Sequence, residues 1–481
     1  MQFLLPFLYA LLFIFLIYKM NFFVIEGLSK NKITGLFVLK LIAGFSFLAI
    51  YKFYYSSGDF DTYFSDSKIL VRSILGNEQE HFSEAWNGNF GDVLYGNARF
   101  IIIINAILQL FSFGNFFVHL IFFNFFSFIG LTALFKAFVK HFPHKKSALL
   151  LGIYFIPSVL FWSSGVLKEG LLMGSLGLFI YFSDFGLLKN YSLKNGFLAI
   201  FFFIAVCFIK TYIGFLLIPL IISNIIVSRT SAKLTGLKYG IVFLIIIFLA
   251  GIIALVKPDY NPLVLISDKQ AKAISESKGG VFLESDKKFI WVDYNLRDSI
   301  LIPQKDFTYK IKTGSSFLSW ELDNMRDTTF VEHSTDTSNY KLDYSVVPAN
   351  TIIELKRLKP NATDFLSNSP KSFYNVLIQP TVFQVKNWLQ LIASIENLSL
   401  LFFIFLALFF YDRSIFKNKE ILLFCFLFTL LLFVLIGITT PSVGGMVRYK
   451  MPALPFLYAS LFLLIDMEKL KKALAFLTKK K

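Results

Sequence analysis

Long apolar runs follow one another through most of the chain, and they constrain its fold more than any other feature of the sequence. Eleven such segments occur, at residues 3–18, 33–55, 116–135, 147–163, 169–183, 196–210, 212–228, 239–256, 397–411, 420–438 and 451–466. Of the 481 residues, 56% are hydrophobic, 61 are phenylalanine and only 16% are charged. A soluble protein with this pattern would expose too much apolar surface. We therefore expect an all-α polytopic membrane protein with about 11 transmembrane helices.

Lysine and arginine are distributed in a way that predicts the orientation of these helices. Basic residues gather in short loops near residues 30–32, 136–146, 189–194, 229–238 and 413–419, and in the tail MEKLKKALAFLTKKK. Because short basic loops face the cytoplasm, we place the C-terminus inside and the N-terminus outside. The net charge of +16 thus indicates topology, and no nucleic-acid partner is expected. We expect an integral protein among the lipids of a bacterial inner membrane, with its functional face toward the periplasm.

The loop after the second apolar segment is acidic and belongs on the opposite side from the basic loops. Residues 57–98 set Lys68 and Arg72 against seven acids, which are Asp59, Asp61, Asp66, Glu78, Glu80, Glu84 and Asp92. If residues 99–112 also spanned the membrane, the basic loop at 136–146 would face outside, against the trend for basic loops. We therefore expect an extracytoplasmic loop at 57–115 that contains an interfacial helix at 99–112.

The second long polar region, at residues 257–396, is too long to be a simple connection. Its segments GGVFLESDKKFIWVDYNL and TIIELKRL alternate or are rich in β-branched residues, which predicts short strands and an α+β fold. Residues 380–397 have the pattern of an amphipathic helix that leads into the next apolar segment. The expected domains are an N-terminal membrane part at 1–256, an extracytoplasmic insert at 257–396, and a C-terminal membrane part with a basic cytoplasmic tail at 397–481.

Three carboxylates stand close together in the early acidic loop, in the stretch SGDFDTYFSDSKIL. Asp59, Asp61 and Asp66 lie within eight positions of one another. A carboxylate at the membrane surface can act as a general base that deprotonates an acceptor hydroxyl or amine. Three acids also allow a divalent cation, although no ligand spacing selects one. The alternative is structural, with Asp59 or Asp61 capping the helix expected over TYFSDSKILVRSIL.

Cationic residues mark two further turns on the same predicted side. Lys168 and Glu169 follow the stretch FIPSVLFWSSGVL. Lys168 either holds an anionic substrate, or it forms an ion pair with Glu169 or extends to the interface in a plain hairpin turn. Arg448 and Lys450 lie in the last outer loop, TTPSVGGMVRYKMPALPF, where cations contradict the positive-inside trend. Arg448 can bind a phosphate in a bidentate manner, or it can extend to the lipid headgroups instead.

Other charged and reactive residues carry less information. Lys40 and Lys210 fall inside apolar segments, where we expect them to face other helices or extend to the interface, and Lys210 equally fits an outer turn. Cys207 and Cys425 both lie in apolar segments, so no disulfide framework is expected. The sequence contains no HExxH, GxSxG or P-loop motif, and its five histidines show no metal-ligand spacing. We therefore assign no metal ligands.

These features resemble the GT-C glycosyltransferases, multi-spanning membrane enzymes that include the protein mannosyltransferases and the lipid A aminoarabinose transferases. The stretch SGDFDTYFSDSKIL after an early helix is similar to their first extracytoplasmic loop, which opens with an acidic pair followed by an aromatic residue. Here Asp59 and Asp61 form D-x-D in place of the commoner D-E pair, so the base stays open between them. IPSVLFWSSGVLKEG is similar to a span and turn of the class, and VRYKMPALPF to its late Arg-Tyr-x-x-Pro element. The insert at 257–396 does not resemble the usual C-terminal domain of these enzymes.

The resemblance implies a transferase that takes a sugar from a polyprenyl-phosphate carrier and gives it to a glycan, lipid or protein acceptor. This reaction would belong to cell-envelope glycan or glycolipid assembly. Asp59 or Asp61 would be the catalytic base, with Asp66 and Glu169 in secondary roles. The residues that would hold the phosphate are Arg448, Lys450, Lys168 and Tyr449. A divalent metal ion is the one cofactor that the acids allow.

Three other functions fit the same sequence. An O-antigen-type polysaccharide polymerase or ligase also has many spans, a large outer loop and cations that bind lipid pyrophosphate. A transporter or flippase for lipid-linked glycans would carry several charges inside its spans, where the sequence has only Lys40 and Lys210. A structural or assembly protein that presents the insert to a partner would need none of this chemistry.

Overall fold

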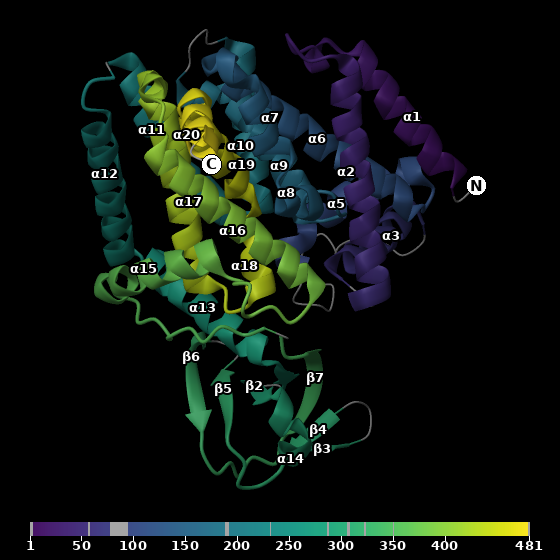
Figure 1. The fold of residues 1–481 in the computed structure, drawn as a ribbon. Coiled ribbons are helices and arrows are strands. Elements are labelled where there is room, and N and C mark those ends of the chain that lie inside the picture. The colour runs from purple at the N-terminus through teal and green to yellow at the C-terminus, as the bar shows by residue number, and fades with distance from the viewer. Residues whose placement is uncertain are drawn as a thin grey trace. The chain divides into compact units, whose positions relative to one another are not determined.

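The structure is a computed structural model, and it describes residues 3–55, 58–76, 95–187, 192–230, 232–285, 288–304, 308–321, 324–349 and 351–479. The predicted outer-loop acids Glu78, Glu80, Glu84 and Asp92 lie outside the described residues, as does Lys189. The chain is mainly helical and forms two compact units (Figure 1). The first unit combines residues 1–246, 380–432 and 450–481, and the second combines residues 247–379 and 433–449.

The first unit is built from helices. In chain order they are α1 (Leu4–Lys19), α2 (Lys30–Ile50), α3 (Asp59–Leu75), α5 (Tyr95–Ser112), α6 (Phe116–His141), α7 (Lys146–Tyr154), α8 (Pro157–Trp162), α9 (Lys168–Ser183), α10 (Leu193–Ile209), α11 (Thr211–Arg229), α16 (Trp388–Phe409), α19 (Leu454–Leu464) and α20 (Met467–Lys479). Two more helices, α12 (Thr235–Val256) and α17 (Lys419–Thr439), run from the first unit into the second.

Within the described part of the chain, six helices are long and apolar enough to cross a membrane. They are Lys30–Tyr55, Phe116–His141, Thr211–Arg229, Thr235–Val256, Trp388–Phe409 and Arg413–Thr439. This set indicates a membrane-embedded protein. Other predicted segments form shorter apolar helices, among them α1 and α10, so the number of about eleven spans stays a prediction.

One predicted span is not a single helix. Residues 147–163 form α7 and α8, which are separated by Phe155 and Ile156. Pro157 occupies the first turn of α8, where its missing N–H is tolerated, and a proline disfavours helical backbone at the residue before it. Ile156 is accordingly extended, with φ −75° and ψ 119°. The prediction of one continuous helix over this segment is therefore wrong.

The centre of the first unit is a close contact between α6 and α9. A Cβ atom built on Gly177 would lie 1.9 Å from the carbonyl oxygen of Gly130, and one built on Gly130 would lie 2.2 Å from the carbonyl oxygen of Met173. Glycine at both positions lets the two backbones approach, as small residues do between packed membrane helices. The pair holds Lys168, the first residue of α9, at the end of a tightly packed element.

The second unit contains an antiparallel sheet of seven strands in the order β3-β4-β7-β1-β2-β5-β6. The strands are β1 (Gly280–Glu284), β2 (Lys288–Asp293), β3 (Leu301–Pro303), β4 (Thr308–Ile311), β5 (Phe317–Glu321), β6 (Asn324–Val331) and β7 (Asn339–Val346), and the helices are α13 (Pro262–Lys278), α14 (Arg297–Ile300), α15 (Ala362–Ile378) and α18 (Val443–Tyr449). Leu283, Ile290 and Tyr340 have no exposed surface and form the centre of one core cluster. The prediction of strands in the insert is confirmed.

Two sequence predictions for the insert are wrong in detail. The segment TIIELKRL, at the described residues 351–358, forms no strand, although Ile352 pairs with Ser442 in an isolated bridge. The helix expected over 380–397 begins only at Trp388, with Asn387 as its cap, and continues without a break as α16. The Asn387 side chain accepts a hydrogen bond from Gln390 N at 2.9 Å, and this cap sets the start of the helix.

A hydrogen-bonded group around Asp336 ties the sheet together. Tyr340, on β7, is fully buried and donates a hydrogen bond of 2.6 Å to the Asp336 carboxylate. The same carboxylate pairs with Lys288, on β2, and accepts a hydrogen bond of 2.8 Å from Ser338 N. Burial alone would raise the pKa of Asp336, but these donors outweigh it and hold the pKa below its ordinary value.

Candidate functional site

The acids of the predicted outer loop lie on α3, and the helix separates them. α3 begins at Asp59, and Gly58 precedes it as an extended cap. Residues four and seven positions apart share a helix face, so Asp59, Tyr63 and Asp66 lie on one face and Asp61 lies opposite. Tyr63 is buried, Asp66 is half-buried and Asp59 is exposed. The predicted cap by Asp59 or Asp61 is wrong, because both acids occupy the first turn, where they interact with the helix dipole.

Asp61 has the ionisation of a base but an unsuitable position. The residue is exposed overall, yet its carboxyl is partly desolvated, which raises its pKa, and a backbone hydrogen bond with Gly58 opposes the rise. A raised pKa suits proton abstraction near neutral pH. However, Asp61 lies on the face of α3 opposite Tyr63, so the helix geometry favours Asp59 and Asp66 as the acids of a shared site.

Lys168 lies beside the acidic face of α3. Its Nζ is 5.8 Å from the centroid of the Tyr63 ring, a distance at which the cation is attracted by the ring. The contact joins α3 to the start of α9, two elements that are far apart in the sequence. We call Asp59, Tyr63, Asp66 and Lys168 the α3–Lys168 site. In this site an ammonium lies against the ring of Tyr63, on the helix face that also carries two carboxylates, and all but Tyr63 are at least partly exposed.

Aromatic rings connect the α3–Lys168 site to the end of α2 and to α8. The Tyr51 ring centroid lies 5.7 Å from that of Phe60, on α3, and 6.5 Å from that of Trp162, at the end of α8. Phe47 packs against the same two rings, at 6.0 Å from Phe60 and 6.3 Å from Trp162. These contacts fix α3 against the turn that carries Lys168, and they give the site an aromatic wall.

The turn before Lys168 is held from inside the helical unit. Lys40, on α2, is buried, and its Nζ donates hydrogen bonds to Ser163 Oγ at 2.7 Å, to Ser163 O at 3.2 Å and to Ser164 Oγ at 3.1 Å. Asn124 Nδ2, on α6, donates to the Ser164 carbonyl at 2.7 Å. The expectation that Lys40 faces other helices is confirmed. Its ammonium satisfies oxygens that would otherwise be buried without donors, so it stabilises the turn.

Glu169 is buried in an ion pair with Lys210. Its carboxylate Oε1 lies 2.9 Å from Lys210 Nζ, and the exposed fractions of the two side chains are 0% and 8%. Lys210 lies between α10 and α11, so it occupies a turn between two helices, and the outward position of this turn stays a prediction. The partner of Glu169 thus comes from a different turn and not only from the neighbouring Lys168. The pair fixes the start of α9, and with it the position of Lys168.

Lys450 lies in a second buried polar cluster, and its expected role in binding phosphate stays a prediction. The residue is 1% exposed, and its Nζ donates a hydrogen bond of 2.6 Å to Asn397 Oδ1. The neighbouring Glu396, on α16, accepts a hydrogen bond of 2.6 Å from Ser158 N in the first turn of α8. Tyr458, on α19, donates to the Glu396 carbonyl at 3.1 Å. These contacts join α8, α16 and α19, so Lys450 has a structural function in this cluster.

The sequence reasoning missed Glu396 and Asn397. It placed Glu396 in an amphipathic helix before the next apolar segment and Asn397 at the first position of that segment, whereas both lie inside α16, one of the helices long enough to cross a membrane. A charged residue and an amide in the middle of an apolar helix are the pattern that would have identified them, because such groups need partners at membrane depth.

Arg448 and Tyr449 belong to the second unit. Both lie on α18 and are half-buried, and the Arg448 Cζ atom is 6.0 Å from the centroid of the Tyr449 ring. The segment before α18 is fixed by a backbone hydrogen bond of 2.6 Å from Ile353 N to the Pro441 carbonyl. Because Asp59 and Arg448 belong to different units, the expectation that they share one pocket stays a prediction.

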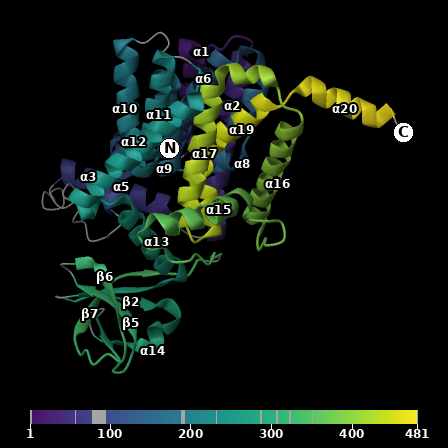
Figure 2. The same cartoon turned by 90° about the vertical axis from the view of Figure 1, so that its left-hand side faces the viewer.

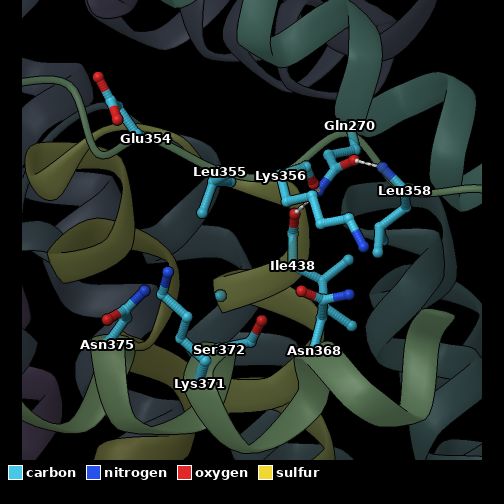
Figure 3. A pocket seen from close by; sticks show the side chains of 11 residues that line it. Gln270, Glu354, Leu355, Lys356, Leu358, Asn368, Lys371, Ser372, Asn375 and Ile438 are labelled. Carbon is cyan, nitrogen blue, oxygen red and sulfur yellow. Dashed lines mark hydrogen bonds between the residues drawn. The ribbon is translucent and has the colours of Figure 1, made fainter.

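The second unit also contains an open pocket with an empty volume of about 340 Å³ (Figure 3). Gln270, on α13, lies at its edge and donates hydrogen bonds to Ile438 O at 2.9 Å and to Lys356 O at 3.2 Å. Its Oε1 atom accepts a hydrogen bond of 2.8 Å from Leu358 N. Gln270 therefore joins α13, α17 and the segment before α15, while Lys371 and its neighbours on α15 line the facing wall. None of the predicted site residues lines this pocket.

The part of the chain that the structure describes contains no group of three or more His, Cys, Asp or Glu side chains placed to hold a metal ion.

His119 is a core residue, with Nδ1 2.7 Å from Asn105 Oδ1 and Nε2 2.9 Å from Ser112 Oγ. These two bonds hold α6 against α5, the helix expected along the membrane interface. Gln109 Nε2, also on α5, donates to Ser67 Oγ of α3 at 2.8 Å. The helix α5, which contains the predicted interfacial residues 99–112, therefore packs directly on α3, the helix that carries the acids of the candidate site.

Comparison with known proteins gives no match. No model of a known protein family matches the chain. No curated protein and no solved structure matches it either.

Proposed function

We propose that the chain is an integral membrane glycosyltransferase that moves a sugar from a polyprenyl-phosphate donor to an acceptor at the extracytoplasmic surface. The acceptor would be a glycan, a lipid or a protein of the cell envelope. In this proposal the predicted apolar segments, about eleven in number, form a GT-C-like membrane domain, with residues 99–112 along its outer surface.

The observation that supports the proposal best is the contact between Lys168 and Tyr63. Proximity of a base, an acceptor and a leaving group is the main requirement of such a transfer. The Lys168 ammonium lies 5.8 Å from the Tyr63 ring, on the helix face that also carries Asp59 and Asp66. An anion-binding group therefore lies against the helix face that carries two candidate bases. The aromatic wall formed by Tyr51 and Trp162 adds apolar faces against which a sugar ring can pack.

In this proposal the sugar is transferred in a single displacement reaction. Asp59 or Asp66 accepts the proton of the acceptor hydroxyl as its oxygen attacks the anomeric carbon of the donor. The bond between that carbon and the phosphate oxygen breaks, and polyprenyl phosphate leaves with the electron pair. Lys168 stabilises the negative charge on the departing phosphate.

The buried charges support a structural role and do not favour a transporter. The structure adds Glu169, Asp184, Glu396, Glu420 and Lys450 to the interior charges that the sequence indicated, and three of them show what such groups do here. Glu169 pairs with Lys210, Lys450 donates to Asn397, and Glu396 accepts from the backbone of α8. Each of these contacts joins different helices or turns, whereas a transport path would need ionisable groups along a route across the bilayer.

The proposal is tested with the full chain in vesicles that contain labelled polyprenyl-phosphate hexoses and unlabelled membrane glycolipids. We expect label to leave the donor, and we expect Asp59→Asn or Asp66→Asn to slow this release at least about 100-fold. Lys168→Gln should slow it by a comparable factor. The matched controls are Asp61→Asn, which makes the same charge change on the opposite face of α3, and Lys52→Gln, which removes an exposed cation from the turn that follows α2.

The outcomes separate the alternatives. Equal effects of Asp59→Asn, Asp66→Asn and Asp61→Asn would contradict the assignment of the acidic face. A ladder of lengthening products that tolerates loss of the acids but not Arg448→Ala would indicate a polymerase or ligase. Donor that crosses the bilayer unchanged would indicate a flippase. If label is not released and donor does not cross the bilayer in any vesicle, the result would favour the structural-protein alternative. Loss of transfer on addition of a chelator would identify a divalent cation.

A further inference from the structure

No residue of the helix α20 takes part in the function proposed above. It follows α19 after Ile465 and Asp466, and Figure 2 shows it extending away from the other helices of the first unit. Side chains in its first turns are exposed, among them Met467, at 53%, and Lys471 and Lys472. An exposed apolar residue at the start of a helix that projects from a membrane protein raises the question of what covers it.

The sequence of α20 is strongly amphipathic. Met467, Leu470 and Ala473 recur at three-residue spacing, which places them on one side of the helix. The charged residues of the same turns, at 468, 469, 471 and 472, fall on the other side, and all but Glu468 are lysines. A helix of low net hydrophobicity with an apolar face and a lysine-rich face is typical of segments that lie in a membrane interface.

The start of α20 is fixed at the ends of two apolar helices. Asp466 N donates to the Phe410 carbonyl at 2.7 Å, and Asp412 N donates to the Leu464 carbonyl at 2.7 Å, so the residues after α16 and α19 form a short backbone pairing. The Asp466 carboxylate accepts hydrogen bonds of 3.1 Å from the backbone of the first turn of α20. Lys469 Nζ donates to the Tyr411 carbonyl at 2.9 Å. Because α16 and α19 end together at this point, the membrane surface is expected at the level where α20 begins.

We propose that α20 lies flat on the membrane surface and binds anionic phospholipid. Its apolar face enters the boundary between headgroups and acyl chains, and Lys471 and Lys472 contact the phosphate groups. The charge of the helix matches this occupant, since its lysines outnumber its single acid. Each lysine near an anionic surface strengthens the association about fivefold. The binding of α20 to lipid depends on no residue of the α3–Lys168 site and is the same on either leaflet.

The test uses the full chain with Cys207→Ser and Cys425→Ser, and with Ala473→Cys carrying an environment-sensitive fluorophore. The protein is reconstituted in vesicles of phosphatidylcholine alone or mixed with phosphatidylglycerol. We expect the emission to shift to the blue, with protection from aqueous iodide and quenching by spin-labelled lipid, only when phosphatidylglycerol is present. Lys471→Glu with Lys472→Glu should lower the ratio of bound to free helix at least about thirtyfold, and added salt should weaken the shift.

The matched control is Lys471→Arg with Lys472→Arg, which keeps the charge and should keep the shift. Equal thermal stability of the glutamate and arginine variants excludes unfolding as the cause of a difference. A probe that stays open to iodide in both kinds of vesicle would overturn the proposal. So would a shift that survives the glutamate substitutions, or one that grows with the ratio of protein to lipid, since the latter would mean that a second copy covers the helix.

Discussion

The buried ion pair between Glu169 and Lys210 permits a sharp test of how this fold is held together. Across the 2.9 Å that separates the two charges, the attraction is about 6 kcal/mol at an effective dielectric constant of about 20. The cost of removing both groups from water is of similar size, so the intact pair contributes little net stability. Removing one partner is different, because the remaining charge is then buried without compensation, at a cost of about 3–5 kcal/mol.

We therefore expect Glu169→Gln and Lys210→Met each to lower the free energy of unfolding by about 3–5 kcal/mol, and the double variant to recover most of that loss. The assay is thermal denaturation of the purified protein in detergent, with the two single variants and the double variant measured together. Lys233→Met, a substitution in an exposed loop of the same unit, serves as the control for loss of a lysine. A double variant whose loss equals the sum of the two single losses would refute the pairing.

Three further substitutions test separate parts of the structure. Gly177→Ala should destabilise the α6–α9 contact by about 2 kcal/mol or more, because its Cβ would lie 1.9 Å from the Gly130 carbonyl oxygen. The control is Gly240→Ala, where the added Cβ has open space, and it should be neutral or stabilising. Both variants are measured by thermal denaturation. Lys40→Met should lower the melting temperature and Lys52→Met should not, since only Lys40 donates to the buried turn. The depressed pKa of Asp336 stabilises the sheet above the unfolded pKa of about 3.9, so wild type should lose its stability advantage over Asp336→Asn as the pH falls below about 4, in unfolding followed by circular dichroism.

The apolar segments and the strands of the insert could be predicted because each depends on local pattern. Runs of hydrophobic residues gave helices such as α6 and α12, and alternation gave β1 and β2. The break at Pro157 was also visible in the sequence, since proline restricts the residue before it. The start of α16 was not, because the side chains of residues 380–387 allow a helix and only the cap at Asn387 decides against it.

The candidate site shows where sequence spacing stops being informative. Helical periodicity is enough to put Asp59 and Asp66 on one face and Asp61 on the other, once the helix is known to begin at Asp59. Which side chain lies beside that face depends on tertiary packing, because Lys168 reaches Tyr63 through the packing of α9 on α6. The partner of Glu169 could not be read from its neighbours in the chain for the same reason.

The gap between α7 and α8 has a consequence for how the protein is assembled. It leaves the amide of Ser158 outside any helical ladder, and the acceptor for this amide is the side chain of Glu396. That acceptor is made by the ribosome more than two hundred residues later. During synthesis this amide therefore lacks its Glu396 acceptor until α16 has been made. A chain cut before α16 should be a substrate for membrane quality control, and the missing helix supplied as a separate peptide should rescue it.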